Sequence, residues 1–404
     1  MWRQITGRWV WVESPALGET EHVIGTYPLP LVEEPRALGK HSKAKETREC
    51  VREKNKNKNL NIAHFGETLL MNPSKTASSV APVDGAESSA YDHTFGSRTL
   101  DEGDDVWSHN AWDHVVPPQE HTDMVEELLN KQAESRVCDD DAARYHAHAS
   151  EYWDSFYSRH ENRFFKDRQW LRIEFPELIA ATRADAPPTT IVELGCGAGN
   201  TVFPLLSMNK NANLRLVACD YAPQAVQVVQ NHPLYQNQST CEAYVYDLSA
   251  GTQHARSTAT EAERLPPNIE PGSVDIVVLI FVLSALHPNE WKAAAENVYL
   301  MLKPRTGLVL LRDYGRHDLP QLRFKKNRLL DDNFYVRGDG TRVYFFTPEE
   351  LMSIFNVAPR GQHKQERFEA QQMAIDRRLL VNRKERKQMF RVWMQAKFLK
   401  TASS

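Results

Sequence analysis

The segment IVELGCGAGN, at residues 191–200, constrains this chain more than any other feature of its sequence. A short apolar run ends in an acid, which predicts a buried strand. Gly195, Gly197 and Gly199 follow and predict a tight turn into a helix, because glycine tolerates the backbone angles that such a turn needs. The amides at the start of that helix would face a ligand. We therefore expect a cofactor to bind here.

The spacing of the glycines indicates which cofactor this is. A nicotinamide fingerprint has its third glycine farther along the chain, where it allows close packing of helix and strand. Here that glycine comes one residue early, and Glu193 stands two residues before the first glycine. The pattern E-x-G-x-G-x-G resembles the first motif of class I S-adenosylmethionine-dependent methyltransferases. On this motif alone, the nicotinamide interpretation remains an alternative.

Composition excludes several classes of protein. The chain has 404 residues, 41% hydrophobic and 25% charged, which predicts a soluble globular domain with extensions. Its net charge of −4 gives no overall preference for nucleic acid, although a global sum can hide a basic face. The five cysteines show no metal-ligand spacing, so we expect a reducing compartment and no metal. The longest apolar run, Val274–Leu286, is shorter than the roughly 18 residues that span a bilayer, so we expect no membrane segment.

Residues 1–90 lack sustained periodicity and are predicted to be a largely disordered tail. Two alternatives are that Met71 is the true start and that the basic run at residues 43–58 contacts RNA. Arg3 and Arg8 stand among apolar residues, but acids follow too soon for a clean transit peptide. A cytoplasmic location is therefore expected, with mitochondrial import as the alternative.

Residues 91–185 are predicted to form a folded N-terminal extension, with a polar helix over 120–149. Trp153 and Tyr157 then stand at i and i+4, so they share one face of a helix. Such an aromatic stripe either packs in the core or closes over the cofactor as a lid. Both interpretations stay open at this point.

The segment FFKDRQWLRIEFPEL, at residues 164–178, mixes Lys166, Arg168 and Arg172 with aromatic and apolar residues. Cations beside rings suit a nucleic-acid backbone with an unstacked base. The alternative is an amphipathic helix whose long cationic side chains lie along the protein surface.

Residues 186–400 alternate strands and helices, which predicts a parallel sheet with ligands at the carboxyl ends of its strands. After the first strand, the expected strands are Leu214–Cys219, Glu242–Tyr246, Val274–Phe281 and Gly307–Asp313. The acids at strand ends are Glu193, Asp220, Asp247 and Asp313. Asp220 is expected to bind ribose hydroxyls, and Asp247 to accept from an adenine amino group or to cap a loop.

Two hairpins are expected beyond the fifth strand. One is inserted at residues 333–346, around the turn signal GDG. The other ends the chain, with a partner strand near Met373–Val381. Apolar and polar residues alternate over 390–398, so one face is expected to pack on the sheet and the other to be wet. We therefore predict an α/β fold, the Rossmann-like doubly wound sheet of class I methyltransferases, mostly parallel with an antiparallel last strand. That pattern fits a nicotinamide dehydrogenase less well.

At this point the motifs resemble one family. FFKDRQWL, LGCGAGN, LIFVLSALHP, RDYG, RFKK, NFYVRGDGTR, YFFTPEEL and FRVWMQAKF are together similar to the tRNA N3-methylcytidine methyltransferases, which modify position 32 in the anticodon loop of threonine and serine tRNAs. FGSRTLDEGDDVWSHNAWDHV and DRRLLVNR are similar to the fungal branch that acts on threonine tRNA. The resemblance covers about residues 95–400. The segment VAPRGQHKQER departs from the loop expected there.

The resemblance implies S-adenosylmethionine as cofactor, the anticodon stem-loop of tRNA as partner, and an aminoacyl-tRNA synthetase as a further partner. Together with Glu193 and Gly197 of the glycine motif, the implied cofactor contacts are Trp153, Tyr157, Gly195, Asp220, Asp247, Leu248 and Ile280. The expected tRNA contacts are Lys166, Arg168, Arg323, Lys325, Lys326, Arg337, Arg342, Arg383, Lys384, Arg386 and Lys387.

Methylation of cytosine N3 needs positioning more than it needs a strong base, because the neutral, unpaired ring has an available lone pair. The base must be flipped into a pocket, where a carboxylate would stabilise the positive charge that grows on the ring. Asp313 is the candidate; its alternative role is a structural acid that bonds Arg312 or a loop amide. A small-molecule methyltransferase and a non-catalytic tRNA-binding adaptor remain as rival functions.

Overall fold

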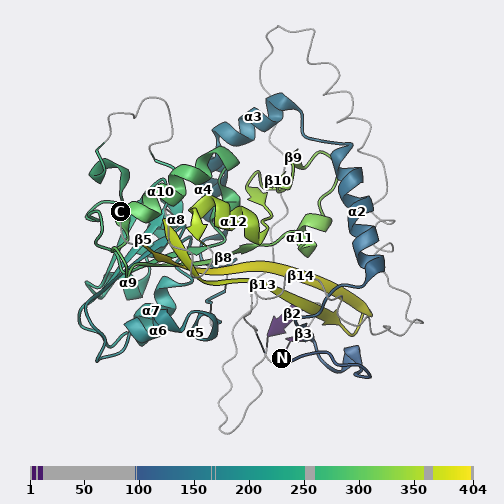
Figure 1. Ribbon diagram of the computed structural model, residues 1–404, viewed down its shortest axis with the longest axis horizontal. Coiled ribbons are helices and arrows are strands. Elements are labelled where there is room, and N and C mark those ends of the chain that lie inside the picture. The colour runs from purple at the N-terminus through teal and green to yellow at the C-terminus, as the bar shows by residue number, and fades with distance from the viewer. Residues whose placement is uncertain are drawn as a thin grey trace. The chain divides into compact units, whose positions relative to one another are not determined.

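The computed structural model of the chain describes residues 2–5, 8–11, 96, 98–164, 166–168, 170–250, 260–358 and 367–401 (Figure 1). The chain divides into two units, residues 1–60 and 61–404. In the first unit, β1 (Trp2–Ile5) and β2 (Arg8–Trp11) pair as an antiparallel hairpin, which the predicted disordered tail did not include. The remainder of that tail, with its basic run, lies outside the described residues.

The second unit is built on a mixed sheet with the strand order β12-β13-β14-β8-β7-β4-β5-β6. Strands β4 to β8 run parallel, and β14 is antiparallel to β8, as the sequence predicted. Their bounds are β4 Thr189–Leu194, β5 Leu214–Asp220, β6 Cys241–Val245, β7 Ile276–Ile280, β8 Leu308–Tyr314, β12 Val357–Ala358, β13 Phe368–Asn382 and β14 Lys387–Lys400. The short β3 (Ala111–Asp113) pairs with β13.

The central strands are buried along almost their whole length because helices cover both faces of the sheet. Every residue of β7 is buried, and in β4 and β5 only one residue each is not. Side chains of α10 and α12 pack on one face, and those of α6, α7 and α8 on the other. The covering helices are α5 Leu171–Glu174, α6 Pro176–Ala181, α7 Val202–Met208, α8 Pro223–Gln230, α9 Pro233–Gln236, α10 Trp291–Met301 and α12 Pro348–Phe355.

Residues 119–160 of the N-terminal extension form α2 (Gln119–Ala133), α3 (Asp139–Ala147) and α4 (Ala149–His160). The single polar helix expected over 120–149 is therefore interrupted between α2 and α3. The buried Gln132 of α2 donates to the carbonyls of Gln321 and Phe324, so it connects α2 with residues 321–324.

A small second sheet is inserted between β8 and α12, where β10 (Phe334–Val336) and β11 (Arg342–Tyr344) form the hairpin that the GDG turn predicted. A third strand, β9 (Leu329–Asp331), pairs with β10 and was not foreseen. The turn packs closely against α4, because a Cβ at Gly340 would lie 2.2 Å from the ring of Tyr152.

Strands β13 and β14 form a long hairpin that projects past the sheet (Figure 1). Strand β14 pairs with β8 only over residues 393–399, and Trp393 stands opposite Tyr314 at the carboxyl end of β8. The earlier part of β14 therefore extends beyond the edge at which parallel strands hold ligands. Strand β3 covers this extension, where Trp112 packs on Leu379 and Phe390.

The alternation predicted for β14 is present, but the face expected to be wet is largely covered. Gln395 is fully buried and donates to Glu174 of α5. Trp393 is half-buried on the same face. A sequence with one polar face indicates a solvated strand only when no other element packs on that face.

The remaining short elements are η2 Val106–Ser108, η3 Ala262–Arg264, η4 Leu283–Ala285, η5 Pro288–Glu290 and α11 Leu319–Leu322. No helix within the described residues is both long and apolar enough to cross a membrane.

Candidate active site

The glycine-rich turn between β4 and α7 adopts a conformation that other residues rarely take. Gly195 and Gly197 have φ angles of +68° and +53°. A Cβ at Gly197 would lie 2.4 Å from the hydroxyl of Tyr157, and one at Gly195 would lie 2.5 Å from Val282. The turn thus needs glycine for its backbone angles and for the close approach of its neighbours.

Asp220, the last residue of β5, holds this turn in place. Its Oδ2 accepts a hydrogen bond from the Gly197 amide at 2.9 Å, and its Oδ1 accepts from the Ala222 amide at 3.0 Å. Burial raises the pKa of the carboxyl to about 6, although these two amides oppose the shift. The acid also lies on the wall of a cavity, so its predicted contact with ribose hydroxyls remains a prediction.

Two cavities meet at the carboxyl end of the sheet, with volumes of about 590 and about 70 Å³. The walls that they share include Trp153, Tyr157 and Gly195. Of the other residues predicted to bind the cofactor, Asp220, Asp247 and Leu248 line the small cavity, and Gly197 and Ile280 line the large one. Residues from five separate stretches of the sequence therefore converge on one continuous site.

The aromatic stripe of α4 belongs both to the core and to this site. Trp153 and Tyr157 stack with their ring centroids 6.0 Å apart. Tyr157 is buried and packs with Ala198 of the glycine turn and Ala222 before α8, whereas Trp153 is only half-buried. Asp154 docks the helix by accepting from the Gln224 amide at 2.7 Å. The two interpretations of the stripe are thus compatible, because one helix face serves both purposes.

Glu193, the acid of the glycine motif, forms an ion pair inside the protein. Its Oε1 lies 3.0 Å from Nη1 of Arg168, which also donates to Thr201 at 2.6 Å. Burial raises the pKa of Glu193 to about 7, and the nearby guanidinium opposes the shift. The second oxygen, Oε2, has no hydrogen-bond partner among the described residues. Arg168 lines the large cavity, so the proposed RNA contact would have to compete with this ion pair.

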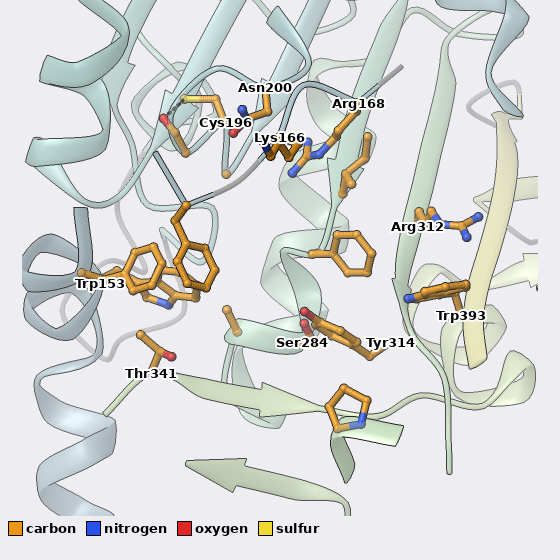
Figure 2. A pocket seen from close by; sticks show the side chains of 18 of the residues that line it. Trp153, Lys166, Arg168, Cys196, Asn200, Ser284, Arg312, Tyr314, Thr341 and Trp393 are labelled. Atoms are coloured by element: carbon orange, nitrogen blue, oxygen red, sulfur yellow. Dashed lines mark hydrogen bonds between the residues drawn. The ribbon is translucent and has the colours of Figure 1, made fainter. Parts of the chain in front are cut away.

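The wall opposite Trp153 contains the buried cation of Arg312 beside Trp393 (Figure 2). The Arg312 guanidinium lies 5.0 Å from the ring of Trp170 and 4.9 Å from that of Trp393. It donates to Asp376 and Gln395, both fully buried. This wall was not predicted from the sequence. Its signal was the face of β14 that carries Trp393 and Gln395, which was expected to be solvated.

Cations and rings dominate the lining of the large cavity. Its acidic residues are Glu174 and Asp339. Its cationic residues are Lys166, Arg168, Arg312, Arg337, Arg378 and Arg391, and its rings include Trp153, Phe164, Phe281, Tyr314 and Trp393. A cavity with this lining suits an aromatic ligand that carries negative charge, such as a nucleotide within a nucleic acid.

Asp313 has the contacts of a structural acid. It is 1% exposed, and its two oxygens accept from the amides of Ser284 at 3.0 Å and Tyr314 at 2.8 Å. Burial raises its pKa to about 6. Ser284 and Tyr314 line the large cavity whereas Asp313 does not. Asp313 therefore holds the backbone of two cavity-lining residues without facing the cavity itself. The alternative role stated for it, bonding a loop amide, is the one that its geometry supports.

The predicted tRNA-binding residues divide by exposure. Arg323, Lys325 and Lys326 are exposed, and the Arg323 guanidinium reaches Met389 of β14 at 3.6 Å. Arg342, in contrast, is 3% exposed, so its position gives no support to an RNA contact. Its guanidinium faces the Ala285 carbonyl, Glu290 and His146.

The residues at the tip of the β13–β14 hairpin have partners within the protein. Arg386 lies 4.1 Å from the ring of Trp107, and Arg383 donates to the Ser108 carbonyl at 3.4 Å. Lys387 pairs with Glu385 at 2.9 Å. Arg337, at the inserted hairpin, donates to Thr341 and lines the large cavity. Their contacts with tRNA stay predictions.

Among the described residues, no group of three or more histidine, cysteine, aspartate and glutamate side chains is placed to hold a metal ion.

Comparisons with known proteins identify the domain. Residues 192–308 match the family described as methyltransferase domain. The tRNA N(3)-methylcytidine methyltransferase of Schizosaccharomyces pombe is 46% identical over 311 residues, which cover 77% of this chain and 93% of that protein. The tRNA(Thr) (cytosine(32)-N(3))-methyltransferase of Saccharomyces cerevisiae is 49% identical over 304 residues. The match covers 75% of this chain and 45% of the yeast protein, so this chain spans less than half of that relative.

A solved structure of a SAM-dependent methyltransferase from Methanosarcina mazei also aligns with this chain. It covers 57% of this chain and 99% of its own, at 17% sequence identity and a TM-score of 0.38.

Trp153→Ala is expected to raise the dissociation constant of S-adenosylhomocysteine about tenfold, because the ring lines both cavities. Titration calorimetry measures this constant. Trp107→Ala is the matched control: this tryptophan is also half-buried but packs under Arg386, away from the cavities. Equal affinities in the two variants would remove Trp153 from the cofactor site.

The affinity for S-adenosylhomocysteine is expected to fall as the pH drops through about 6, the pKa of Asp220. Protonation removes the charged acceptor that ribose hydroxyls would use, so binding favours the carboxylate. The sign for stability is opposite: because the pKa is raised by burial, the stability that Asp220 contributes is greatest at low pH and is lost as the pH rises through about 6.

Asp220→Asn separates this group from the other buried acids. The variant keeps Glu193 and Asp313 but cannot ionise at residue 220. Binding measured from pH about 7 to about 5 should therefore weaken in the parent and stay level in the variant. If cofactor affinity falls by the same amount in both proteins, a group other than Asp220 causes the pH dependence.

Proposed function

The chain belongs to the family of tRNA N3-methylcytidine methyltransferases, and we propose that it transfers a methyl group from S-adenosylmethionine to N3 of cytidine 32 in the anticodon loop of threonine tRNA. Serine tRNA is the second candidate substrate. The observation that carries the proposal is the pair of adjoining cavities: the predicted cofactor residues line the small cavity and the part of the large one that adjoins it, and cations and rings line the rest of the large cavity.

The small cavity and the glycine turn fit the cofactor. A Cβ at Gly195 or Gly197 would displace Val282 or Tyr157, so the glycines let these two cavity-lining residues pack directly on the turn. Asp220 would hold the ribose hydroxyls, and Asp247 and Leu248 the adenine. S-adenosylmethionine supplies an electrophilic methyl group on a sulfonium. The protein's part is to fix its orientation and to keep water from it with Trp153 and Tyr157.

The large cavity fits the target base. A cytosine that is flipped out of the anticodon loop needs aromatic side chains to stack on and a fixed orientation of N3. Trp153 and Trp393 stand on opposite walls of the cavity (Figure 2), and Tyr314 is fixed by Asp313 through its amide. As the ring gains positive charge, Asp339 and Glu174 are the acids on the wall that could stabilise it.

The basic segments support an RNA substrate over a small molecule. The contact of Arg323 with Met389 brings the exposed Lys325 and Lys326 beside β14. The part of β14 around Met389 lies beyond the carboxyl end of β8, on the side of the cavities. A small-molecule methyltransferase has no use for this surface.

An aminoacyl-tRNA synthetase partner and a cytoplasmic location stay predictions, with mitochondrial import as the alternative.

Purified protein incubated with S-adenosylmethionine and unmodified threonine tRNA is expected to form N3-methylcytidine, detected by mass spectrometry of the digested nucleosides. A transcript with uridine in place of cytidine 32 is the matched control and should gain no methyl group. Methylation of both transcripts at another site, or of neither while the cofactor binds, would contradict the proposed reaction.

Lys325→Ala combined with Lys326→Ala is expected to lower the slope of log binding constant against log salt by about one to two units, because each lost phosphate contact releases about one counterion fewer. Fluorescence anisotropy with labelled tRNA measures this slope.

The matched control is Lys210→Ala with Arg305→Ala. It removes the same charge from exposed positions before β5 and β8, at the amino end of the sheet. If both double variants lower the slope equally, the 325–326 segment has no specific place in the tRNA interface.

A further inference from the structure

Asn297 lies in α10 and is fully buried, yet it lines neither cavity. Its Nδ2 donates to the carbonyls of Leu248 at 2.8 Å and Ala250 at 2.9 Å. Its Oδ1 accepts from Nε of Arg264 at 3.0 Å. Both amide hydrogens and the amide oxygen are therefore in use, and a flipped amide would set its oxygen against two carbonyls.

Asparagine is a poor choice for the interior of a helix, because its side chain competes for backbone hydrogen bonds. A fully buried amide is also costly unless its partners are all present. Asn297 meets that condition through two carbonyls of the loop after β6 and the Arg264 guanidinium. Its place in α10 is thus explained by the loop that it holds and not by the helix.

That loop forms one wall of the small cavity. Tyr246, Asp247 and Leu248 line it. Within the loop, the Ser249 amide and hydroxyl both donate to Oδ1 of Asp247, at 2.9 and 2.8 Å. Asn297 bonds the carbonyls on either side of Ser249, so it fixes the segment that orients the Asp247 carboxylate.

A second connection secures the start of the loop. The Tyr246 hydroxyl donates to the Arg264 carbonyl at 2.8 Å, while the Arg264 side chain reaches Asn297. Arg264 also pairs with Glu296, the neighbour of Asn297, at 3.5 Å. The wall is therefore linked to α10 at both ends, through Arg264 at Tyr246 and directly at Leu248.

We infer that Asn297 is a positioning residue for the adenosine part of the cofactor, acting through the loop 246–250. It touches no ligand itself. Its hydrogen bonds keep Asp247 and Leu248 on the wall of the small cavity when that cavity is empty, so the cofactor does not have to order the loop on binding. The inference rests on the proposed function, because it takes the small cavity as the adenosine site.

The chain offers a matched control in Asn211, which is 2% exposed. Its Nδ2 donates to the carbonyls of Ala181 and Pro187, each at 3.0 Å, and its Oδ1 accepts from the Asn213 amide at 2.9 Å. The chemistry is the same: one buried side-chain amide donates to two backbone carbonyls. Asn211 precedes β5, however, so it lies at the amino end of the sheet, away from both cavities.

Asn297→Ala and Asn211→Ala are therefore compared in the full chain. Each variant loses an amide that donates to two backbone carbonyls, so both should lower the melting temperature. Only Asn297→Ala should raise the dissociation constant of S-adenosylhomocysteine, by about tenfold or more, and the KM for S-adenosylmethionine with it. The KM for tRNA and kcat at saturating cofactor should stay near those of the parent in both variants.

Equal cofactor affinity in parent and Asn297→Ala, or an equal loss in the two variants, would overturn the inference and leave Asn297 a purely structural residue. If Asn297→Ala does not fold, Arg264→Met tests the same contacts from a partly exposed side chain, and a smaller loss of affinity in the same direction is expected. A parent protein that binds no S-adenosylhomocysteine would instead overturn the proposed function, so the two failures are distinguishable.

Discussion

The two hydrogen bonds from Gly197 and Ala222 to the Asp220 carboxylate are the constraint on which the site depends. The bond from Gly197 joins the glycine turn after β4 to the end of the neighbouring strand β5. The bond from Ala222 fixes the Asp220 carboxylate within its own turn. The glycine turn then has a single shape, against which the Tyr157 hydroxyl can pack without room for a Cβ. Because the carboxyl is buried, its charged form is disfavoured, and the hydrogen bonds from these amides oppose that effect.

The N-terminal extension is a structural part of the site, because the strands alone leave it open on one side. Helix α4 is docked on α8 by Asp154, and its rings close the junction between the two cavities. On the far side, the β13–β14 hairpin brings Trp393 and Gln395 against Arg312 of β8. The cavities thus lie between a segment that precedes the sheet in the chain and the strands that end it.

Local patterns were sufficient for some parts of this arrangement and not for others. Gly197 and Asp220 could be predicted because a strand end and a glycine turn are read from adjacent residues. Arg312 and Trp393 could not, because their meeting depends on the register of β14 against β8 and on α5 covering the strand face. Arg342 shows the limit of charge patterns: an arginine between aromatic strands can be a surface cation or, as here, a buried one.

The buried Arg312–Asp376 pair is better understood through the reaction than through stability. Desolvation of two charges offsets most of their attraction, and burial lowers the pKa of the Arg312 guanidinium even beside its partner. The pair does, however, hold a flat cation between Trp170 and Trp393, which leaves the indoles little freedom to turn. A reaction whose nucleophile is already a neutral ring nitrogen gains its rate from alignment. In the proposed reaction, the wall of rings and guanidinium groups would supply that alignment.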